Sequence, residues 1–144
     1  MSDLRGAISV AGIGNTNRWS APGRTAFDQL QEATFLALED AGLSLKDVDA
    51  LYCAHSTSGL PVLNAAERLG IAGQLRHADG TMVGGASFLF HLRSAMSALA
   101  TGQCDVALLC YGSNQRSAGG KLAPMPDPQP FEAPYKPRYP LSSY

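Results

Sequence analysis

The pattern of hydrophobic and polar positions in the first third of the chain predicts two strands with one amphipathic helix between them. Residues 7–14 (AISVAGIG) are uniformly small or apolar, which is typical of a strand covered on both faces. Between Thr25 and Ala41, apolar residues recur at steps of three and four, which predicts an amphipathic helix. Thr25 and Gly42 are suited to cap its ends. After a short turn, residues 48–55 (VDALYCAH) predict a second strand.

The rest of the pattern centres on a long apolar helix. A short helix at 62–69 and a short strand at 74–78 precede it. Residues 84–100 then predict a helix that is apolar nearly all round, as in helices buried in a protein interior. One predicted face carries Phe88, Leu89, Leu92, Ala95, Met96 and Leu99, and the other carries His91, Ser94 and Ser97. Residues 105–112 (DVALLCYG) predict the last strand.

This alternation predicts an α/β fold over residues 1–112, with a mixed, mainly parallel sheet and a buried central helix. Seven prolines between Pro124 and Pro140 are incompatible with a helix or a central strand. Residues 113–144 are therefore predicted to form an extended Pro-rich arm, with a disordered end as the alternative. A buried helix needs covering layers on both sides, so the pattern favours a missing carboxyl-terminal half or a partner subunit.

Composition narrows the function classes. Charged residues make up 16% of the chain and the net charge is -1. The sequence has no basic stripe, so nucleic acid is not an expected partner. No apolar run reaches the roughly 18 residues of a membrane helix, and the first residues do not resemble a secretory signal. The three cysteines lie in apolar contexts, which fits a protein of the reducing cytoplasm better than a disulfide framework. The sequence has no cluster of cysteines and histidines, so a metal site is not expected.

Several segments together, in this order, resemble the thiolase superfamily. Residues 37–51 (ALEDAGLSLKDVDAL) are similar to its first helix leading into its second strand. Residues 84–87 (GGAS) and 102–108 (GQCDVAL) resemble the start of its central helix and the approach to its fourth strand. Residues 111–117 (YGSNQRS) resemble the acetyl-CoA-acetyltransferase-like and lipid-transfer-protein-like branch. The resemblance implies a thiolase-like amino-terminal half-domain, with CoA thioesters as substrates and no cofactor.

The start of the central helix departs from the thiolases that act through a cysteine. Those enzymes place the thiol at this helix amino terminus, where free N–H groups stabilise a thiolate. Residues 83–87 (VGGAS) hold no cysteine. Buried structural roles are the better interpretation of Cys53, Cys104 and Cys110.

Other residues provide weaker candidates for catalysis. Ser87 and His91 lie one helical turn apart and form a weak catalytic pair, although a helical hydroxyl more often bonds its own backbone. His77 and Asp79 fit a polar loop better than a catalytic pair. Gly84 and Gly85 are candidates for substrate binding through their N–H groups, or they allow a helix to begin in a crowded core. The resemblance also implies a substrate contact at Asn114.

Three functions remain open. The chain is half of an enzyme that makes or breaks bonds next to a CoA thioester, by acyl transfer or retro-aldol cleavage; or it binds acyl-CoA or lipid without chemistry; or it is a scaffold for an active partner. Catalytic residues are expected in the missing half. The resemblance further implies a homodimer paired through an edge strand near Arg76–Ala78, besides a possible hetero-partner. Proline at position 78 should break that pairing.

Overall fold

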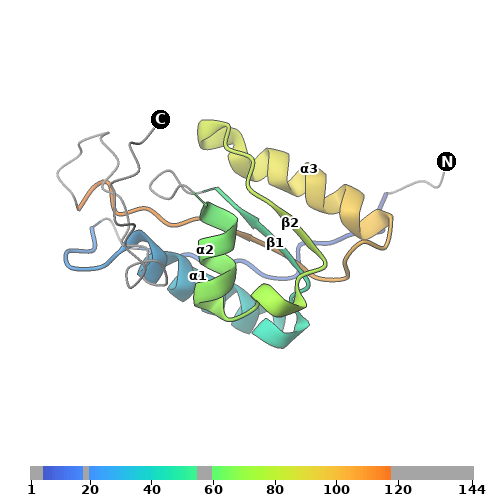
Figure 1. Ribbon diagram of the computed structural model, residues 1–144, viewed down its shortest axis with the longest axis horizontal. Coiled ribbons are helices and arrows are strands. Elements are labelled where there is room, and N and C mark those ends of the chain that lie inside the picture. Colours follow the sequence, from blue (N-terminus) through green and yellow to red (C-terminus); the bar gives the residue numbers. More distant parts are fainter. Residues whose placement is uncertain (1–4, 18–19, 55–59, 118–144) are drawn as a thin grey trace, which may run out of the picture.

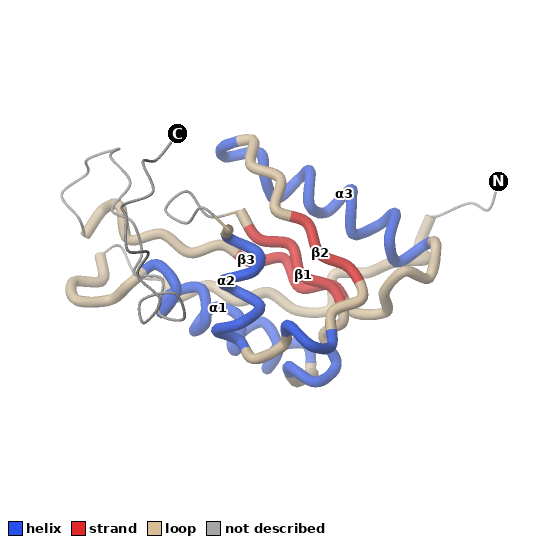
Figure 2. Tube along the Cα trace, viewed as in Figure 1, coloured by secondary structure: helices blue, strands red, loops and turns tan. Residues whose placement is uncertain are grey.

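The computed structural model describes residues 5–17, 20–54 and 60–117. Three strands form a parallel sheet in the order β2-β1-β3, with α1 and α2 on one face and α3 on the other (Figures 1 and 2). This three-layer arrangement confirms the predicted α/β class. The elements in chain order are α1 (Ala26–Ala41), β1 (Ala50–Cys53), α2 (Pro61–Leu69), β2 (His77–Asp79), α3 (Ser87–Ala100) and β3 (Ala107–Cys110).

Helix α1 forms as its apolar stripe and capping residues predict. The Asp28 N–H donates to Thr25 Oγ1 at 3.1 Å, and the Thr25 N–H donates to Asp28 Oδ2 at 2.7 Å, which completes a capping box. Gly42 ends the helix in the left-handed conformation, with φ of 66°. The buried side chains of the stripe include Phe27, Leu30 and Leu38.

The predicted strand over residues 7–14 is wrong, because this segment does not join the described sheet. Its backbone instead runs against α1. A Cβ on Gly12 would lie 2.3 Å from the Ala37 carbonyl oxygen, and one on Gly14 would lie 1.9 Å from that of Ala33. The small residues that looked like a covered strand allow this close backbone-to-helix contact.

The short strand predicted at residues 74–78 begins later in the structure. There β2 covers His77–Asp79. The Gln74 side-chain amide donates to the carbonyl oxygens of Leu45 at 2.6 Å and Val48 at 2.7 Å. These bonds hold a 3₁₀ turn, Ala72–Gln74, so that the extended backbone begins later.

Helix α3 contacts the sheet only partly through its predicted apolar face. Its buried residues are Ser87, His91, Ala95 and Ala98, and Leu99 packs partly buried against the same cluster. The remaining large residues of that face, Phe88, Leu89, Leu92 and Met96, are exposed. Leu89 is 71% exposed. Small residues allow α3 to approach the strands closely, which explains why they occupy the contact. The described residues thus cover one side of the helix that was predicted to be buried on both.

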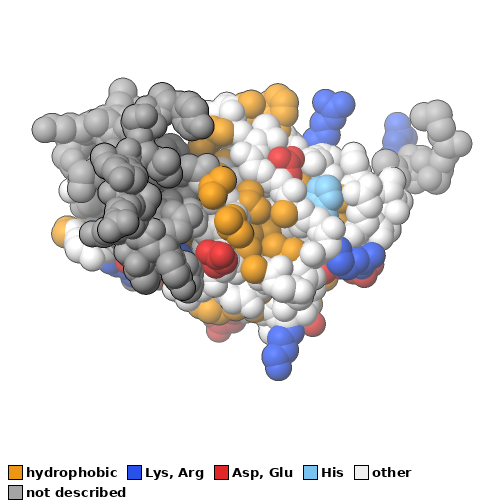
Figure 3. Space-filling view, in the orientation of Figure 1, with side chains coloured by type: hydrophobic (Ala, Val, Ile, Leu, Met, Phe, Trp, Pro, Cys, Tyr) orange, Lys and Arg blue, Asp and Glu red, His pale blue; other side chains and the backbone are white. Residues whose placement is uncertain are grey.

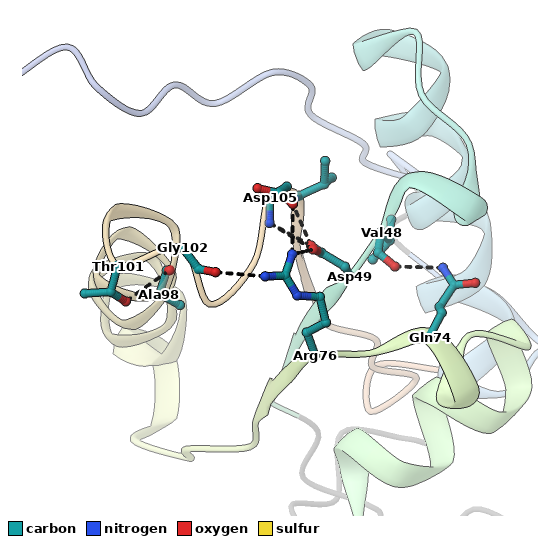
Figure 4. A network of polar contacts seen from close by, with 9 residues as sticks. Val48, Asp49, Gln74, Arg76, Ala98, Thr101, Gly102 and Asp105 are labelled. Atoms are coloured by element: carbon teal, nitrogen blue, oxygen red, sulfur yellow. Dashed lines mark hydrogen bonds and ion pairs between the residues drawn. The ribbon is translucent and has the colours of Figure 1, made fainter.

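A polar network joins the amino ends of the three strands (Figure 4). Asp49 accepts hydrogen bonds from the N–H groups of Asp105, at 2.9 Å, and Val106, at 2.8 Å. Arg76 donates to the carboxylates of Asp49, at 3.0 Å, and Asp105, at 2.8 Å. Its second terminal nitrogen donates to the Gly102 carbonyl oxygen at 2.8 Å. The network therefore ties the loop after α3 to the starts of the strands.

Two predictions fall wholly or largely outside this description. Most of the predicted Pro-rich arm, residues 118–144, lies outside the described residues, as does the predicted end of the second strand at position 55. Among the described helices, none is long and apolar enough to cross a bilayer.

Candidate functional site

The carboxyl ends of the parallel strands and the start of α3 lie at the same end of the molecule (Figure 1). The ring of Phe88, in the first turn of α3, contacts that of Tyr111, directly after β3, with centroids 6.2 Å apart. Ligands of open parallel sheets bind at the carboxyl ends of the strands. This end of the molecule is therefore the candidate site.

The turn between β2 and α3 forms the centre of the site. The side chains of Asp79 and His91 hold it through hydrogen bonds to Thr81. Asp79 Oδ1 accepts from the N–H of Thr81 at 3.0 Å and from its hydroxyl at 2.9 Å. His91 Nε2 lies 2.9 Å from the Thr81 carbonyl oxygen, so Nε2 carries a proton and donates it. Burial raises the pKa of Asp79, but the hydrogen bonds from Thr81, together with His91 and Ser94, outweigh that effect and leave the pKa below its usual value.

Gly84 and Gly85 lie at the end of this turn, directly before α3. Gly84 has φ of 65°, which favours glycine, and it begins a 3₁₀ turn, Gly84–Ala86, that leads into α3. Among the residues that the structure describes, a Cβ added to either glycine would meet no atom within 4 Å. Whether these glycines bind substrate or let the helix begin in a crowded core stays a prediction. The first N–H groups of a helix have no partner within it, and Gly84 and Gly85 at this helix start are exposed.

The Ser87 hydroxyl bonds to the backbone of the same turn. It accepts from the Val83 N–H at 3.1 Å and donates to the Gly84 carbonyl oxygen at 2.7 Å. His91 lies below it, 1% exposed, and no hydrogen bond joins the two side chains in the described part of the chain. The bonds found here position the turn, and a catalytic role for Ser87 and His91 remains a prediction.

A buried tyrosine next to His91 was missed by sequence reasoning. Tyr52 is fully buried, and its ring centroid lies 5.8 Å from that of His91 and 5.4 Å from that of His77. The Tyr52 hydroxyl and His91 Nδ1 are buried without a hydrogen-bond partner among the described residues. Burial raises the pKa of Tyr52. The available signal was a phenol within an otherwise apolar strand, since buried tyrosines usually need a polar neighbour.

Asn114 lies in the loop that follows β3, at the same end of the sheet. The Gln29 side-chain amide holds this loop to α1 by donating to the Ser113 carbonyl oxygen at 2.6 Å. Asn114 is half-buried there. The structure thus places Asn114 near the carboxyl end of β3, and its contact with substrate remains a prediction.

The three cysteines are buried, as their apolar contexts predict. Cys53 and Cys110 are register partners on β1 and β3. A hydrogen bond with Cys53 and burial raise the pKa of the Cys110 thiol, and burial raises that of Cys104. Protonated, buried thiols are poor nucleophiles. Among the described residues, no group of histidine, cysteine or carboxylate side chains could hold a metal ion.

Exposed apolar side chains surround the turn. They come from the turn itself, from the start of α3 and from the residue after β3: Met82, Val83, Phe88, Leu89 and Tyr111. An exposed apolar patch of this kind marks a surface that another protein segment or a ligand covers. The candidate site is thus the exposed Gly84–Gly85 turn within an apolar border.

Comparison with known proteins defines the class of this fold. No protein-family model matches the chain. A solved structure described as an Ltp2–ChsH2(DUF35) aldolase is 31% identical, with a TM-score of 0.61, over 74% of this chain and 28% of that one. A 3-oxoacyl-(acyl carrier protein) synthase III from Pseudomonas aeruginosa is 33% identical, with a TM-score of 0.51, over 60% of this chain and 27% of that one. The fold is therefore thiolase-like.

Two curated proteins are similar to this chain in sequence. It is 35% identical over 119 residues to a steroid side-chain-cleaving aldolase from Thermomonospora curvata, and 34% identical over 116 residues to a 17-hydroxy-3-oxo-4-pregnene-20-carboxyl-CoA lyase from Mycobacterium tuberculosis. The matches cover 81% and 79% of this chain and 29% of each relative. The chain belongs to the thiolase-like superfamily, and it spans less than a third of the length of these relatives.

Proposed function

We propose that the chain supplies the oxygen-binding turn of a thiolase-like enzyme that cleaves a carbon–carbon bond of a CoA thioester by a retro-aldol reaction. The observation that carries this proposal is the exposed Gly84–Gly85 turn at the start of α3, in a stretch, residues 83–87, that holds no cysteine. The names of the relatives, an aldolase and a CoA lyase, support the same reaction class.

The chemistry fits a site built from backbone donors. In a retro-aldol step, a base takes the proton of the β-hydroxyl, the β-carbon becomes a carbonyl, and the bond between the α- and β-carbons breaks. The electron pair passes to the thioester as an enolate, which is then protonated at the α-carbon. N–H groups at Gly84 and Gly85 would stabilise the enolate oxygen. The base and the acid would come from chain that covers the outward face of α3.

Acyl transfer through a covalent intermediate receives less support. It needs a nucleophile at the turn. The Ser87 hydroxyl is hydrogen-bonded to the backbone on both sides, and the buried thiols of Cys104 and Cys110 have raised pKa values. Retro-aldol chemistry needs no covalent attachment at this position.

The same proposal includes partners. The exposed apolar face of α3 would be covered by a carboxyl-terminal half or by another subunit, and the aldolase of known structure is described as an assembly of two named components. The edge strand β2 would pair with a second copy of this chain. We place the working protein in the cytoplasm.

A glycine substitution tests the turn. Because a Cβ at Gly85 meets open space, Gly85→Val should leave the fold intact while filling the position that the thioester oxygen would take. Gly73→Val is the matched control, since a Cβ there also meets open space. Calorimetry with a β-hydroxyacyl-CoA should show affinity weakened at least about tenfold by Gly85→Val, with the control unchanged.

The alternatives give different results in the same experiments. Binding to the parent chain that Gly85→Val does not alter would contradict the proposed turn. Binding without release of a shorter acyl-CoA by the chain assembled with its partner would support a lipid-binding protein. A tight complex with another polypeptide and no affinity for CoA thioesters would support a scaffold.

A further inference from the structure

The side chains packed on the two faces of the sheet differ in polarity. On the side of α1 and α2, the buried cluster is apolar and includes Leu30, Leu51 and Ile71. Figure 3 shows that hydrophobic side chains also gather on the outer surface around α2. On the side of α3, Tyr52 and His91 are 0% and 1% exposed and bring polar groups into the interior. Buried polar groups are nearly always hydrogen-bonded, so these two side chains require partners.

The His91 imidazole donates from one nitrogen and can accept at the other. Nε2 lies 2.9 Å from the Thr81 carbonyl oxygen, which can only accept, so Nε2 carries a proton. In a neutral imidazole, Nδ1 then has a lone pair and accepts. Nδ1 is buried, and no donor among the described residues bonds to it. A charged imidazole would instead bury a second N–H without an acceptor, which costs more.

Tyr52 can supply the missing donor. Its hydroxyl is buried without a hydrogen-bond partner among the described residues, and the centroids of the two rings lie 5.8 Å apart. The other polar neighbour is Ser94: burial raises the pKa of Tyr52, and the Ser94 hydroxyl opposes that effect. Ser94 directs its own proton to Asp79 Oδ2, at 3.4 Å. A phenol has one proton, and only its donation to His91 Nδ1 leaves neither buried group without a partner.

We propose that the Tyr52 hydroxyl donates to His91 Nδ1, and that the two residues position the Gly84–Gly85 turn from the central strand of the sheet. The imidazole is then held at both nitrogens, and its Nε2–H fixes the Thr81 carbonyl. Asp79 already accepts from the N–H and the hydroxyl of Thr81, so every polar group of Thr81 is bonded. The use of this turn for catalysis rests on the proposed function, whereas the bond between the two side chains does not.

Nitrogen NMR of the imidazoles of the 144-residue chain tests this bond. We expect His91 to be the neutral Nε2–H tautomer, with the Nδ1 resonance shifted to lower frequency by the bond that it accepts. Tyr52→Phe should move this resonance to higher frequency. Ser94→Ala is the matched control and should leave it in place. A charged imidazole, a proton on Nδ1, or a resonance that responds to Ser94→Ala and not to Tyr52→Phe would overturn the bond.

The sign of a stability change gives an independent measurement. Removing a buried hydroxyl that has no partner leaves stability unchanged or raises it, whereas removing one that bonds to Nδ1 leaves a buried acceptor unpaired. Tyr52→Phe should therefore unfold at a lower urea concentration than the parent chain. An equal or higher midpoint would show that the hydroxyl has no partner and would overturn the proposal.

Substitutions at His91 separate positioning from packing. His91→Gln keeps a terminal N–H that can reach the Thr81 carbonyl, whereas His91→Leu fills a similar volume without a donor. The amide resonances of Gly84 and Gly85 should move in His91→Leu and in Tyr52→Phe, and stay near their parent positions in His91→Gln. In calorimetry with 3-hydroxybutyryl-CoA, His91→Leu should weaken affinity at least about tenfold and His91→Gln by no more than about threefold.

The outcomes distinguish the positioning role from the proposed function. Equal effects of His91→Gln and His91→Leu, or glycine amides that no variant moves, would overturn the positioning role. A parent chain that does not bind the thioester would contradict the proposed function of the turn. The resonances of His91, Gly84 and Gly85 would still decide whether Tyr52 and His91 position it.

Discussion

Asp49 should contribute more to stability than any other member of the network at the strand amino ends. Its carboxylate accepts from the N–H groups of Asp105 and Val106 and from Arg76. Asp49→Ala removes the acceptor of two backbone N–H groups at once. Hydrogen bonds to a charged group contribute about 1.5–3 kcal/mol each when buried, but water can reach this edge. We therefore expect a loss of about 2 kcal/mol in the free energy of unfolding, measured by urea denaturation.

Two further variants separate the backbone bonds from the surface ion pair. Asp105→Ala removes only a carboxylate that is 82% exposed and pairs with Arg76, so it should have little effect. Asp49→Asn keeps one acceptor oxygen and should lie between the other two variants. An Asp49→Ala chain as stable as the parent, or an Asp105→Ala chain destabilised to the same extent, would refute this account of the network.

The same carboxylate should make stability depend on pH. Burial raises the pKa of Asp49, but hydrogen bonds from Val106, Asp105 and Arg76 outweigh it and leave the pKa below its usual value. A lowered folded-state pKa stabilises the fold above the unfolded-state value of about 3.9, and this stabilisation disappears as the pH falls through the folded-state pKa. Asp49→Asn should therefore flatten the loss of stability below about pH 4. An unchanged acid slope would contradict the argument.

Three further substitutions test packing and pairing. Gly14→Ala should cost roughly 3 kcal/mol in urea denaturation, because its Cβ would lie 1.9 Å from the Ala33 carbonyl oxygen; destabilisation no greater than in Gly73→Ala would contradict that contact. Thr34→Val should stabilise by up to about 1 kcal/mol, because the Thr34 hydroxyl is buried without a partner among the described residues, and a large loss would show that it has one. Ala78→Pro removes an outward N–H, so it should convert a dimer to a monomer in light scattering, and an unchanged mass would exclude the pairing.

The sequence predicted best those elements whose signals are local. Helix α1 carries its stripe, its capping box and its terminal glycine within its own residues, and all of them have the predicted roles. The parallel strands β1 and β3 lie within their predicted apolar runs. These features depend on spacing alone, so they can be deduced without the rest of the fold.

Features that depend on distant contacts were not predicted correctly. Gly12 and Gly14 look like part of a covered strand, and only the position of α1 shows that they contact a helix. Apolar residues all round α3 indicate that both of its sides are covered. They do not indicate which side the sheet covers. The sheet contacts Ala95 and Ala98 because small side chains allow close approach. The hydrogen bonds of Ser87 likewise depend on the fold of the preceding turn.

The outward face of α3 and the Gly84–Gly85 turn are parts of one surface. Leu89 and Phe88 lie in the first turn of the helix, directly after the turn, and Tyr111 contacts Phe88 from the end of β3. A layer that buries these side chains must also close over the turn. On the proposed function, exclusion of water would then strengthen the N–H groups as donors to a developing oxyanion. The same contact would thus complete the hydrophobic core and create the proposed catalytic environment, so Leu89→Lys should weaken assembly and the proposed activity together.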